Sequence, residues 1–227
     1  MNSQSVIEIK SLSGKAYVIN GKGGSVLIDT AWPPGWMVVR SLRSKGIALD
    51  RISLILITHG HTDHFGNALY LRRKTGACVA IHELDAEGPR KGRNVPLYTQ
   101  VPFQKVLAMF ARRLRTRPFE PDVLLRGEEG DLLEYGVEAR WVRTPGHSEG
   151  SISILLPDGV AIVGDLVVGR FGSGSRPASP MWVRDRETLR ESIRKLLENE
   201  PRTILSGHGG PFDVEDVRRV FLGQAVQ

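Results

Sequence analysis

The sequence has one cysteine, no long apolar run and no charged-then-apolar leader at its N-terminus. Cys78 alone cannot form an internal disulfide, which suits a reducing compartment. No stretch approaches the roughly 20 apolar residues that span a bilayer, so we expect no membrane partner. The absence of a secretory signal pattern points the same way. Together these absences predict a cytoplasmic protein.

The composition is that of an ordinary globular domain, with 41% hydrophobic and 25% charged residues among 227. The 31 Lys and Arg exceed the 25 Asp and Glu, which gives a formal net charge of +6. Such a charge would attract anionic partners, and the densest basic stretch is ARRLRTR at 111–117. We favour a solvated basic surface over a nucleic-acid partner, because net charge alone is a weak signal of a partner.

Short apolar segments separated by glycine-rich turns predict strands, and stretches of helical spacing lie between them. SLILIT at 53–58 is continuously apolar, as expected for a strand buried on both faces. Asp185 is expected to cap an amphipathic helix. The alternation predicts an α/β (α+β) fold of packed sheets with helices outside. Further strands are expected at 6–9, 16–20, 25–30, 78–82, 151–157, 160–168 and 203–208, and helices at 36–46 and about 65–75.

Three of the six histidines crowd into ITHGHTDH at 57–64, directly after a predicted buried strand. Protonated imidazoles repel one another, and burying them unpaired is costly, so a metal ion is the first candidate to draw them together. Side chains alternate along an extended segment, so His59 and His61 point the same way. Asp63 and His64 follow where the chain turns into a helix, and they could hold a second metal.

Three later stretches supply further candidate ligands, each at or near the end of an apolar strand. In TPGHSEGS, VGDLVV and SGHGGPF a glycine directly precedes His147, Asp165 and His208. Glycine permits the sharp turns and close backbone approach that such a site requires. All candidate ligands are nitrogen or oxygen donors, which suits zinc and is compatible with iron or manganese. His82 matches no such motif, so we expect a structural or rim role for it.

The order of LIDT (27–30), THGHTDH, TPGHSEGS, GDLVV and SGHGG resembles the metallo-β-lactamase fold superfamily. The resemblance implies a single domain over residues 1–227, folded as a four-layer αββα sandwich and holding two divalent metal ions. It places His59, His61 and His147 on one metal, Asp63, His64 and His208 on the other, Asp165 between them, and Asp29 as an acid beside the site.

This resemblance implies hydrolysis by a metal-activated hydroxide, with Asp63 handling the proton of the attacking water. A small-molecule ester, thioester or lactone, anionic ones included, is the expected substrate. Flavodiiron-type oxidoreductases carry glutamate where this chain has His61, which disfavours that branch. Glyoxalase II-like thioesterases typically add a C-terminal helical domain, whereas only 19 residues follow His208 here. Lactonases remain open.

Three alternatives to this function remain. A phosphodiesterase or nuclease of the same fold is suggested by the basic charge alone. A persulfide dioxygenase-like enzyme would use a related site with one iron. A metal-binding protein without catalysis would keep the ligands and lose turnover.

The segment 89–121 adds no metal ligand and is predicted to contain a helix from Pro102. Insertions in this region of the fold often cap the active site, so a lid is favoured over a plain surface helix. Its apolar stripe would bring Phe103 and Phe110 to the substrate. GRFGSGSRP at 169–177 is expected to be a flexible loop beside the pocket, where Arg170 or Arg176 would meet a substrate anion.

Overall fold

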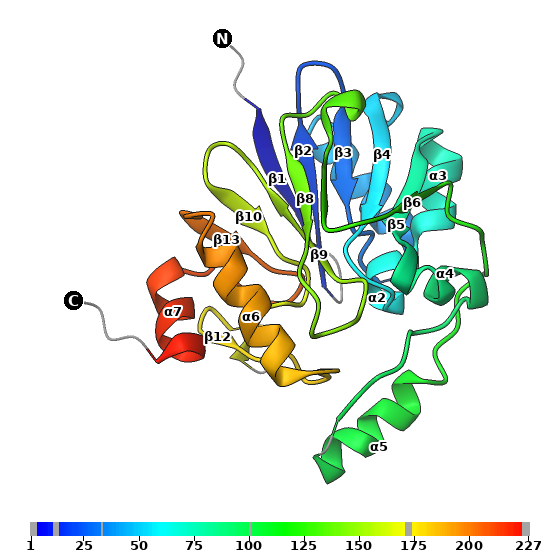
Figure 1. The fold of residues 1–227 in the computed structure, drawn as a ribbon. Helices are drawn as coiled ribbons and strands as arrows, with labels where there is room; N and C mark the ends of the chain where they lie inside the picture. The colour runs from blue at the N-terminus through cyan, green and yellow to red at the C-terminus, as the bar shows by residue number, and fades with distance from the viewer. Residues whose placement is uncertain (1–3, 11–13, 33, 100, 171–173, 224–227) are drawn as a thin grey trace.

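The computed structural model describes residues 4–10, 14–32, 34–99, 101–170 and 174–223. Two sheets form its centre (Figure 1). The first has the order β1-β2-β3-β4-β5-β6, in which β3 to β6 run parallel and β1 to β3 antiparallel. Its strands are β1 (Ser5–Lys10), β2 (Lys15–Asn20), β3 (Ser25–Ile28), β4 (Ile52–Ile57), β5 (Cys78–His82) and β6 (Val123–Leu125).

The second sheet has the order β13-β10-β9-β8-β7 and is antiparallel except for the pair β10 and β13. A two-stranded ribbon, β11 with β12, lies apart from it. The strands are β7 (Glu129–Asp131), β8 (Arg140–Arg143), β9 (Ile152–Leu155), β10 (Val160–Ile162), β11 (Val168–Gly169), β12 (Pro177–Ala178) and β13 (Thr203–Leu205).

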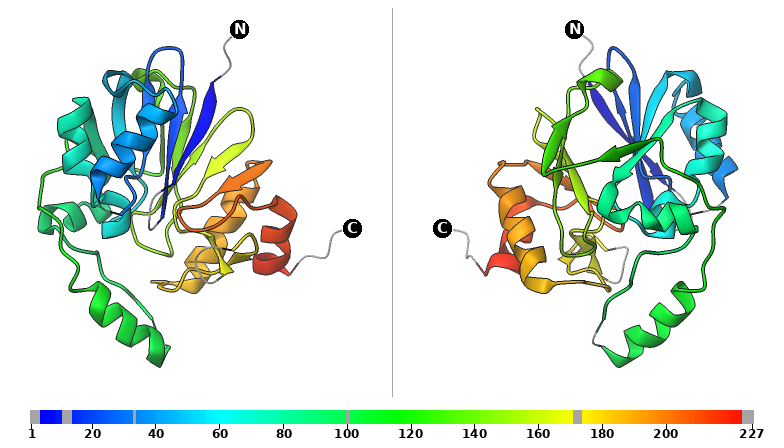
Figure 2. Two further views of the ribbon diagram at one scale, coloured as in Figure 1. Left: turned by 180° about the vertical axis from the view of Figure 1, so that it is seen from behind. Right: turned by 45° about the vertical axis from the view of Figure 1, so that its right-hand side comes forward.

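Helices cover the outer face of each sheet, which gives four layers (Figure 2). Strand residues of the first sheet pack against α1 and α3, those of the second pack against α6 and α7, and the inner faces pack on each other. The predicted α/β sandwich is therefore confirmed. The helices are α1 (Gly35–Ser44), α2 (Thr62–Phe65), α3 (Ala68–Thr75), α4 (Glu87–Lys91), α5 (Pro102–Ala111), α6 (Arg186–Leu197) and α7 (Val214–Leu222), with 3-10 turns η1 (Leu49–Arg51), η2 (Glu83–Asp85) and η3 (Leu133–Tyr135).

Local signals fix most of these elements. Asp185 caps α6 as predicted, because its carboxylate accepts a 2.8 Å hydrogen bond from the Thr188 backbone N–H.

Two predicted elements are divided in the structure. The helix expected at 65–75 becomes α2 and α3, and the strand expected at 160–168 ends at Ile162 and resumes as β11. The chain turns at Gly164, whose φ of 51° is easiest for glycine.

Both sheets end in loops at one common edge. β3, β4 and β5 are parallel, so their carboxyl ends meet there. In the second sheet β8, β10 and β13 run in one direction, so the segments that follow them reach the same edge. Every motif with candidate metal ligands follows one of these strands.

One part of the chain departs from the sandwich. The insertion (residues 89–121) leaves the body, forms α5 and returns, and α5 projects from the body in the views of Figures 1 and 2. Within the described residues, no helix combines the length and the apolar character needed to cross a membrane.

Candidate metal centre

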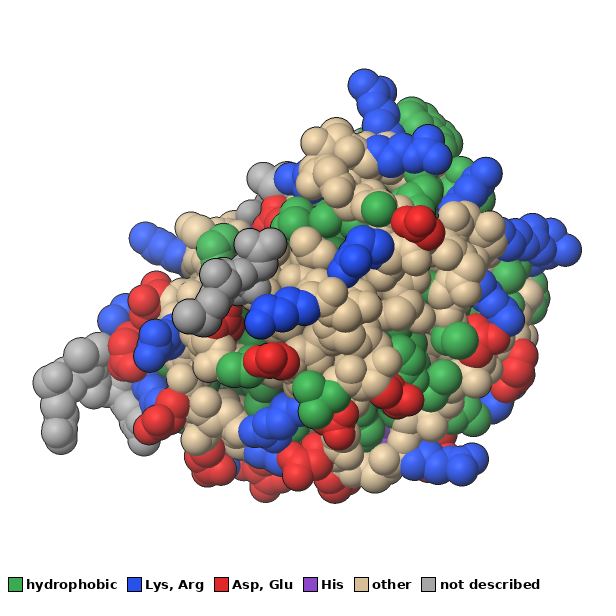
Figure 3. Space-filling view, turned by 90° about the horizontal axis from the view of Figure 1, so that it is seen from above, with side chains coloured by type: hydrophobic (Ala, Val, Ile, Leu, Met, Phe, Trp, Pro, Cys, Tyr) green, Lys and Arg blue, Asp and Glu red, His purple; other side chains and the backbone are tan. Residues whose placement is uncertain are grey.

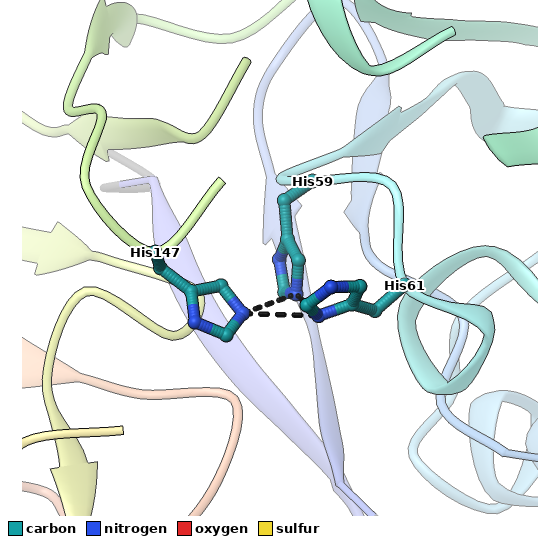
Figure 4. Close-up of side chains that lie close together, drawn as sticks. All are labelled: His59, His61 and His147. Carbon is teal, nitrogen blue, oxygen red and sulfur yellow. Dashed lines mark hydrogen bonds between the residues drawn. The ribbon is translucent and has the colours of Figure 1, made fainter. Parts of the chain in front are cut away.

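Three imidazoles converge at the edge where the sheets end (Figure 4). His59 and His61 follow β4, and His147 lies in the loop between β8 and β9. His147 Nε2 lies 3.2 Å from His59 Nε2 and 3.0 Å from His61 Nδ1, and the last two atoms are 3.1 Å apart. Metal–nitrogen bonds of about 2.0–2.1 Å give separations of about 3 Å between neighbouring ligand nitrogens. The triangle therefore has the size of a metal-binding face.

Hydrogen bonds to the outer ring nitrogens fix two of the three tautomers. His147 Nδ1 lies 2.6 Å from the Trp182 carbonyl oxygen, which can only accept, so Nδ1 carries the proton. The Thr58 hydroxyl donates to Asp29 and so accepts from His59 Nδ1 at 3.1 Å. Both Nε2 lone pairs consequently face the centre of the triangle, as metal ligation requires. The outer nitrogen of His61 has no partner among the described residues.

These three rings are buried and neutral. Burial lowers the pKa of His59 well below its ordinary value, and the neighbouring rings lower it further. Burial and His147 lower the pKa of His61 to about 3. Burial is also the main cause of the lowered pKa of His147. Neutral imidazoles offer lone pairs without first releasing a proton, so the triad suits a divalent cation.

A second cluster of donors adjoins the first. Asp63, His64 and His208 each place a ligand atom within 4.8 Å of the others. Asp165 lies between the clusters: its carboxylate oxygens are 3.5 Å from His64 Nε2, 3.8 Å from His147 Nε2 and 3.7 Å from His208 Nε2. The pKa of His208 is raised, chiefly by Asp165 and then by Asp63. Nearby histidines lower the pKa of Asp165 despite its burial, so this bridge between the clusters is ionised.

Asp29 holds ligands of both clusters in place. Its carboxylate accepts 2.8 Å hydrogen bonds from the Thr58 backbone N–H, the Thr58 hydroxyl and His64 Nδ1. The hydrogen bond to Asp29 directs His64 Nε2 toward the second cluster. Although burial opposes them, Asp29, Asp165 and Asp63 raise the pKa of His64, so a cation bound there would replace the proton on Nε2. Through the Thr58 hydroxyl, Asp29 also acts on His59. Asp29 has a φ of 59°, a backbone conformation that residues other than glycine rarely adopt. Such strained conformations cluster at functional sites, and here the strained residue is the one whose carboxylate orients ligands of both clusters.

Atoms without partners show that the two clusters fit metal ions. His64 Nε2 and Asp165 Oδ1 are buried and face each other at 3.5 Å, and neither has a hydrogen-bond partner among the described residues. Such orphaned atoms are rare in proteins unless an ion or water satisfies them. The space around them is small: a Cβ on Gly207 would lie 2.6 Å from His64 Cε1 and 2.7 Å from Asp165 Oδ1. Glycine before His208 therefore leaves room for the site.

Asp85 is a buried carboxylate of the site that lies outside the motifs recognised in the sequence. It accepts hydrogen bonds from the Gly60 N–H at 2.7 Å, the Ser148 hydroxyl at 2.6 Å and the Gly150 N–H at 2.9 Å. It thereby joins the loop of His59 and His61 to the loop of His147. Its position three residues after β5, at the edge where the ligands gather, was the available signal.

A cavity of about 550 Å³ opens onto the clusters. Gln104 of α5 lines it, whereas Phe103 and Phe110 do not and are 70% and 60% exposed. Arg170 and Arg176 are exposed and also outside its lining, and residues 171–173 of their loop lie outside the described part of the chain. The lining consists of His61, Asp63, Gln104, His147, Asp165, Val168, Gly169, Ala178, Ser179, Pro180, Met181, Trp182 and His208.

The sixth histidine stands apart from the cluster. His82 is buried at the end of β5, where its Nε2 lies 3.1 Å from the Gly127 carbonyl oxygen. Its ring packs edge-on to Trp141 with centroids 6.0 Å apart. These contacts are those of a structural side chain between the sheets.

Known proteins resemble this chain over most of its length, including all the segments that form the site. A family model described as the metallo-beta-lactamase superfamily matches residues 10–208. A hydroxyacylglutathione hydrolase of Cereibacter sphaeroides is 31% identical over 83% of the chain, which spans only 58% of that relative. A probable metallo-hydrolase of Bacillus subtilis is 25% identical, with 85% of the chain and 78% of the relative covered. A solved metallo-beta-lactamase family protein of Thermus thermophilus is 24% identical with a TM-score of 0.70, covering 98% and 78% of the chains.

Proposed function

The chain belongs to the metallo-beta-lactamase superfamily and has its hydrolase fold, and we propose that it uses two divalent metal ions to hydrolyse a thioester or related acyl substrate. The observation that carries this proposal is the pair of donor clusters on either side of Asp165, one buried and the other partly exposed. One cluster alone would suffice for a structural or a mononuclear site. Two clusters with a carboxylate between them supply the donors that a dinuclear site needs.

The donors divide between the two ions by position. His59, His61 and His147 would hold one ion, and Asp63, His64 and His208 the other. Asp165 faces both sets, so its carboxylate would contact both ions. The nitrogen and oxygen donors suit zinc. Bound there, a pair of divalent ions supplies a water of lowered pKa and an electrophile for the scissile carbonyl.

Asp63 is the group placed to move the proton. His64 and the hydrogen bond from His208 keep the pKa of Asp63 below its ordinary value although burial opposes them, so it is a carboxylate at neutral pH. Its side chain is 30% exposed and lines the cavity, so it can reach an attacking water. Without metal, His208 Nε2 lies 3.0 Å from Asp63 Oδ2, so these two donor atoms face the same point, and a bound ion would take the place of this hydrogen bond.

The cavity supports a small acyl substrate. Its volume of about 550 Å³ lies within the usual range for small-molecule sites. Val168, Pro180, Met181 and Trp182 provide apolar walls beside the polar clusters. The relative named hydroxyacylglutathione hydrolase makes a thioester the first candidate, with esters and lactones next. We propose a single metallo-β-lactamase-like domain for this activity, with the insertion as a helical addition.

A substrate panel tests the proposal. Metal-loaded protein would be offered a hydroxyacyl-glutathione thioester, simple esters, lactones and a phosphodiester, beside the His147→Ala variant as the matched control. We expect turnover of at least one acyl substrate, and a loss of about a hundredfold or more in the variant. Turnover of the phosphodiester alone would support a nuclease instead. Bound metal without turnover of any substrate would support a binding protein.

A further inference from the structure

The helix α5 presents an apolar face to solvent. Phe103, Val106, Met109 and Phe110 are between 46% and 70% exposed. At about 100° per residue they fall within an arc of about 120°, which makes one continuous stripe. We call these four residues the α5 apolar face. Leu114, 42% exposed, follows just beyond the helix.

The opposite side of α5 faces the body of the protein. Ala108 is buried there, and Gln104 lines the cavity. The ends of the insertion are anchored, because Asn94 Nδ2 donates to the Ala111 carbonyl at 2.9 Å and Thr116 N to the Gly92 carbonyl at 2.9 Å. The α5 apolar face therefore points away from the cavity, and substrate contact does not explain it.

The net positive charge of the chain comes from the segment around this helix. Residues 88–119, which we call the acid-free segment, contain eight Lys and Arg and no Asp or Glu. The rest of the chain has 23 Lys and Arg against 25 Asp and Glu, a net charge of −2. The net positive charge of the protein thus comes from one segment. The face at the top of Figure 1, away from α5, instead carries interspersed acidic and basic side chains (Figure 3).

Five of these basic side chains carry a charge that could face an anionic partner, although Arg112 and Arg115 also donate to the carbonyls of Leu97 and Leu114. They are exposed, and within the described part of the chain none of them pairs with a carboxylate. The other three lie near the start of the segment, where Arg90 and Lys91 already pair with Glu120 and Glu87. The five are Lys105, Arg112, Arg113, Arg115 and Arg117.

We propose that α5 docks the protein onto an anionic lipid bilayer, with the α5 apolar face in the interface and the neighbouring arginines on the headgroups. A short apolar helix face beside Lys and Arg is the combination that binds anionic membrane surfaces. The lack of a bilayer-spanning run predicts no membrane partner. Docking through α5 would revise that expectation, because it needs contact only with the surface of the bilayer.

Charge and shape favour the bilayer over other partners. A second copy docked through the same helix would bring two acid-free segments against each other, and like charges would repel. Single-stranded RNA binds by stacking bases on aromatic rings, and Val106 and Met109 offer none. Aliphatic side chains between the two phenylalanines suit an acyl-chain boundary instead.

Vesicle flotation tests the proposal. Metal-loaded protein would be mixed with vesicles of phosphatidylcholine alone or with about 30% phosphatidylglycerol added. We expect binding to the anionic vesicles only. The Phe103→Ser/Phe110→Ser variant should lose it by at least tenfold, and each of Arg113→Gln and Arg115→Gln by about fivefold. Leu133→Ser, at an apolar site 62% exposed elsewhere, and Arg40→Gln on α1 are matched controls that should bind as wild type.

Several outcomes would overturn the proposal. They include no binding to anionic vesicles at low salt, or equal binding by the double phenylalanine variant with an unchanged melting temperature. Sedimentation as a dimer that the same variant makes monomeric would assign the α5 apolar face to a second copy. Tight binding of single-stranded RNA that the variant abolishes would assign it to RNA. Hydrolytic activity enters none of these readouts, so failure here leaves the proposed function untouched.

Discussion

The substitution Asp85→Asn removes a charge from the contact that joins the two histidine loops. One amide oxygen can replace only one carboxylate oxygen. If it stays with Gly60 and Ser148, the amide NH2 faces the Gly150 N–H, donor against donor. Loss of that hydrogen bond costs about 2 kcal/mol, and the two that remain weaken by about 1 kcal/mol each when the acceptor loses its charge. A neutral amide costs less to bury than a carboxylate, which offsets part of this loss. We therefore expect the free energy of unfolding to fall by about 2–3 kcal/mol in total.

The loss has two separate readouts. Urea unfolding of the metal-free protein measures stability, and competition with a chelator measures metal affinity, which should fall about 10- to 100-fold as the loops separate. Ser148→Ala removes one of the three donors and should give a smaller loss in both. Asp158→Asn, at an exposed turn between β9 and β10, is the matched control. Unchanged stability and metal affinity in Asp85→Asn would refute the role of Asp85 as the link between the loops.

Three further outcomes are expected. Asp165→Asn should lower bound metal from about two ions to about one per chain by elemental analysis, because a neutral amide bridges two cations poorly; full occupancy would contradict the bridging role. Metal at about a hundredfold excess over the Kd of each site should raise the free energy of unfolding by about 2.7 kcal/mol per occupied site, or about 5.4 kcal/mol for two, and a chelator should reverse it; an unchanged urea midpoint would mean that no folded-state site exists. Gln104→Ala should change kcat/KM between small and large acyl substrates with metal content intact, whereas equal loss for every substrate would remove Gln104 from the cavity wall.

The candidate ligands predicted from the sequence lie together in the structure because they sit in short motifs directly after apolar strands. Parallel pairing carries the ends of β3, β4 and β5 to one edge, so local patterns translate into a shared location. The glycines before His147, Asp165 and His208 also follow strands that end at this edge, so they marked the turns at which the candidate ligands lie. Asp85 escaped notice because its partners Gly60, Ser148 and Gly150 are distant in sequence, and only the packed sheets bring them together.

The orientation of α5 within the insertion could not be predicted from the sequence. Helical spacing predicted α5 and its stripe, but spacing does not say which way a stripe faces. The expected substrate contacts of Phe103 and Phe110 assumed that the apolar side faces the cavity, whereas the structure places Gln104 there. The orientation depends on contacts at the base of the insertion, such as Asn94 with Ala111, which periodicity does not reveal. Lid function for the insertion stays a prediction.

The location of the metals tests the central claim most directly. An anomalous difference map, from crystals of protein purified without chelator, would be measured above the absorption edge of the bound metal. Two peaks are predicted, one at the triangle of His59, His61 and His147 and one among Asp63, His64 and His208, with Asp165 contacting both. A single peak at the triangle with an empty second cluster, or no peak at either, would contradict a two-metal hydrolase.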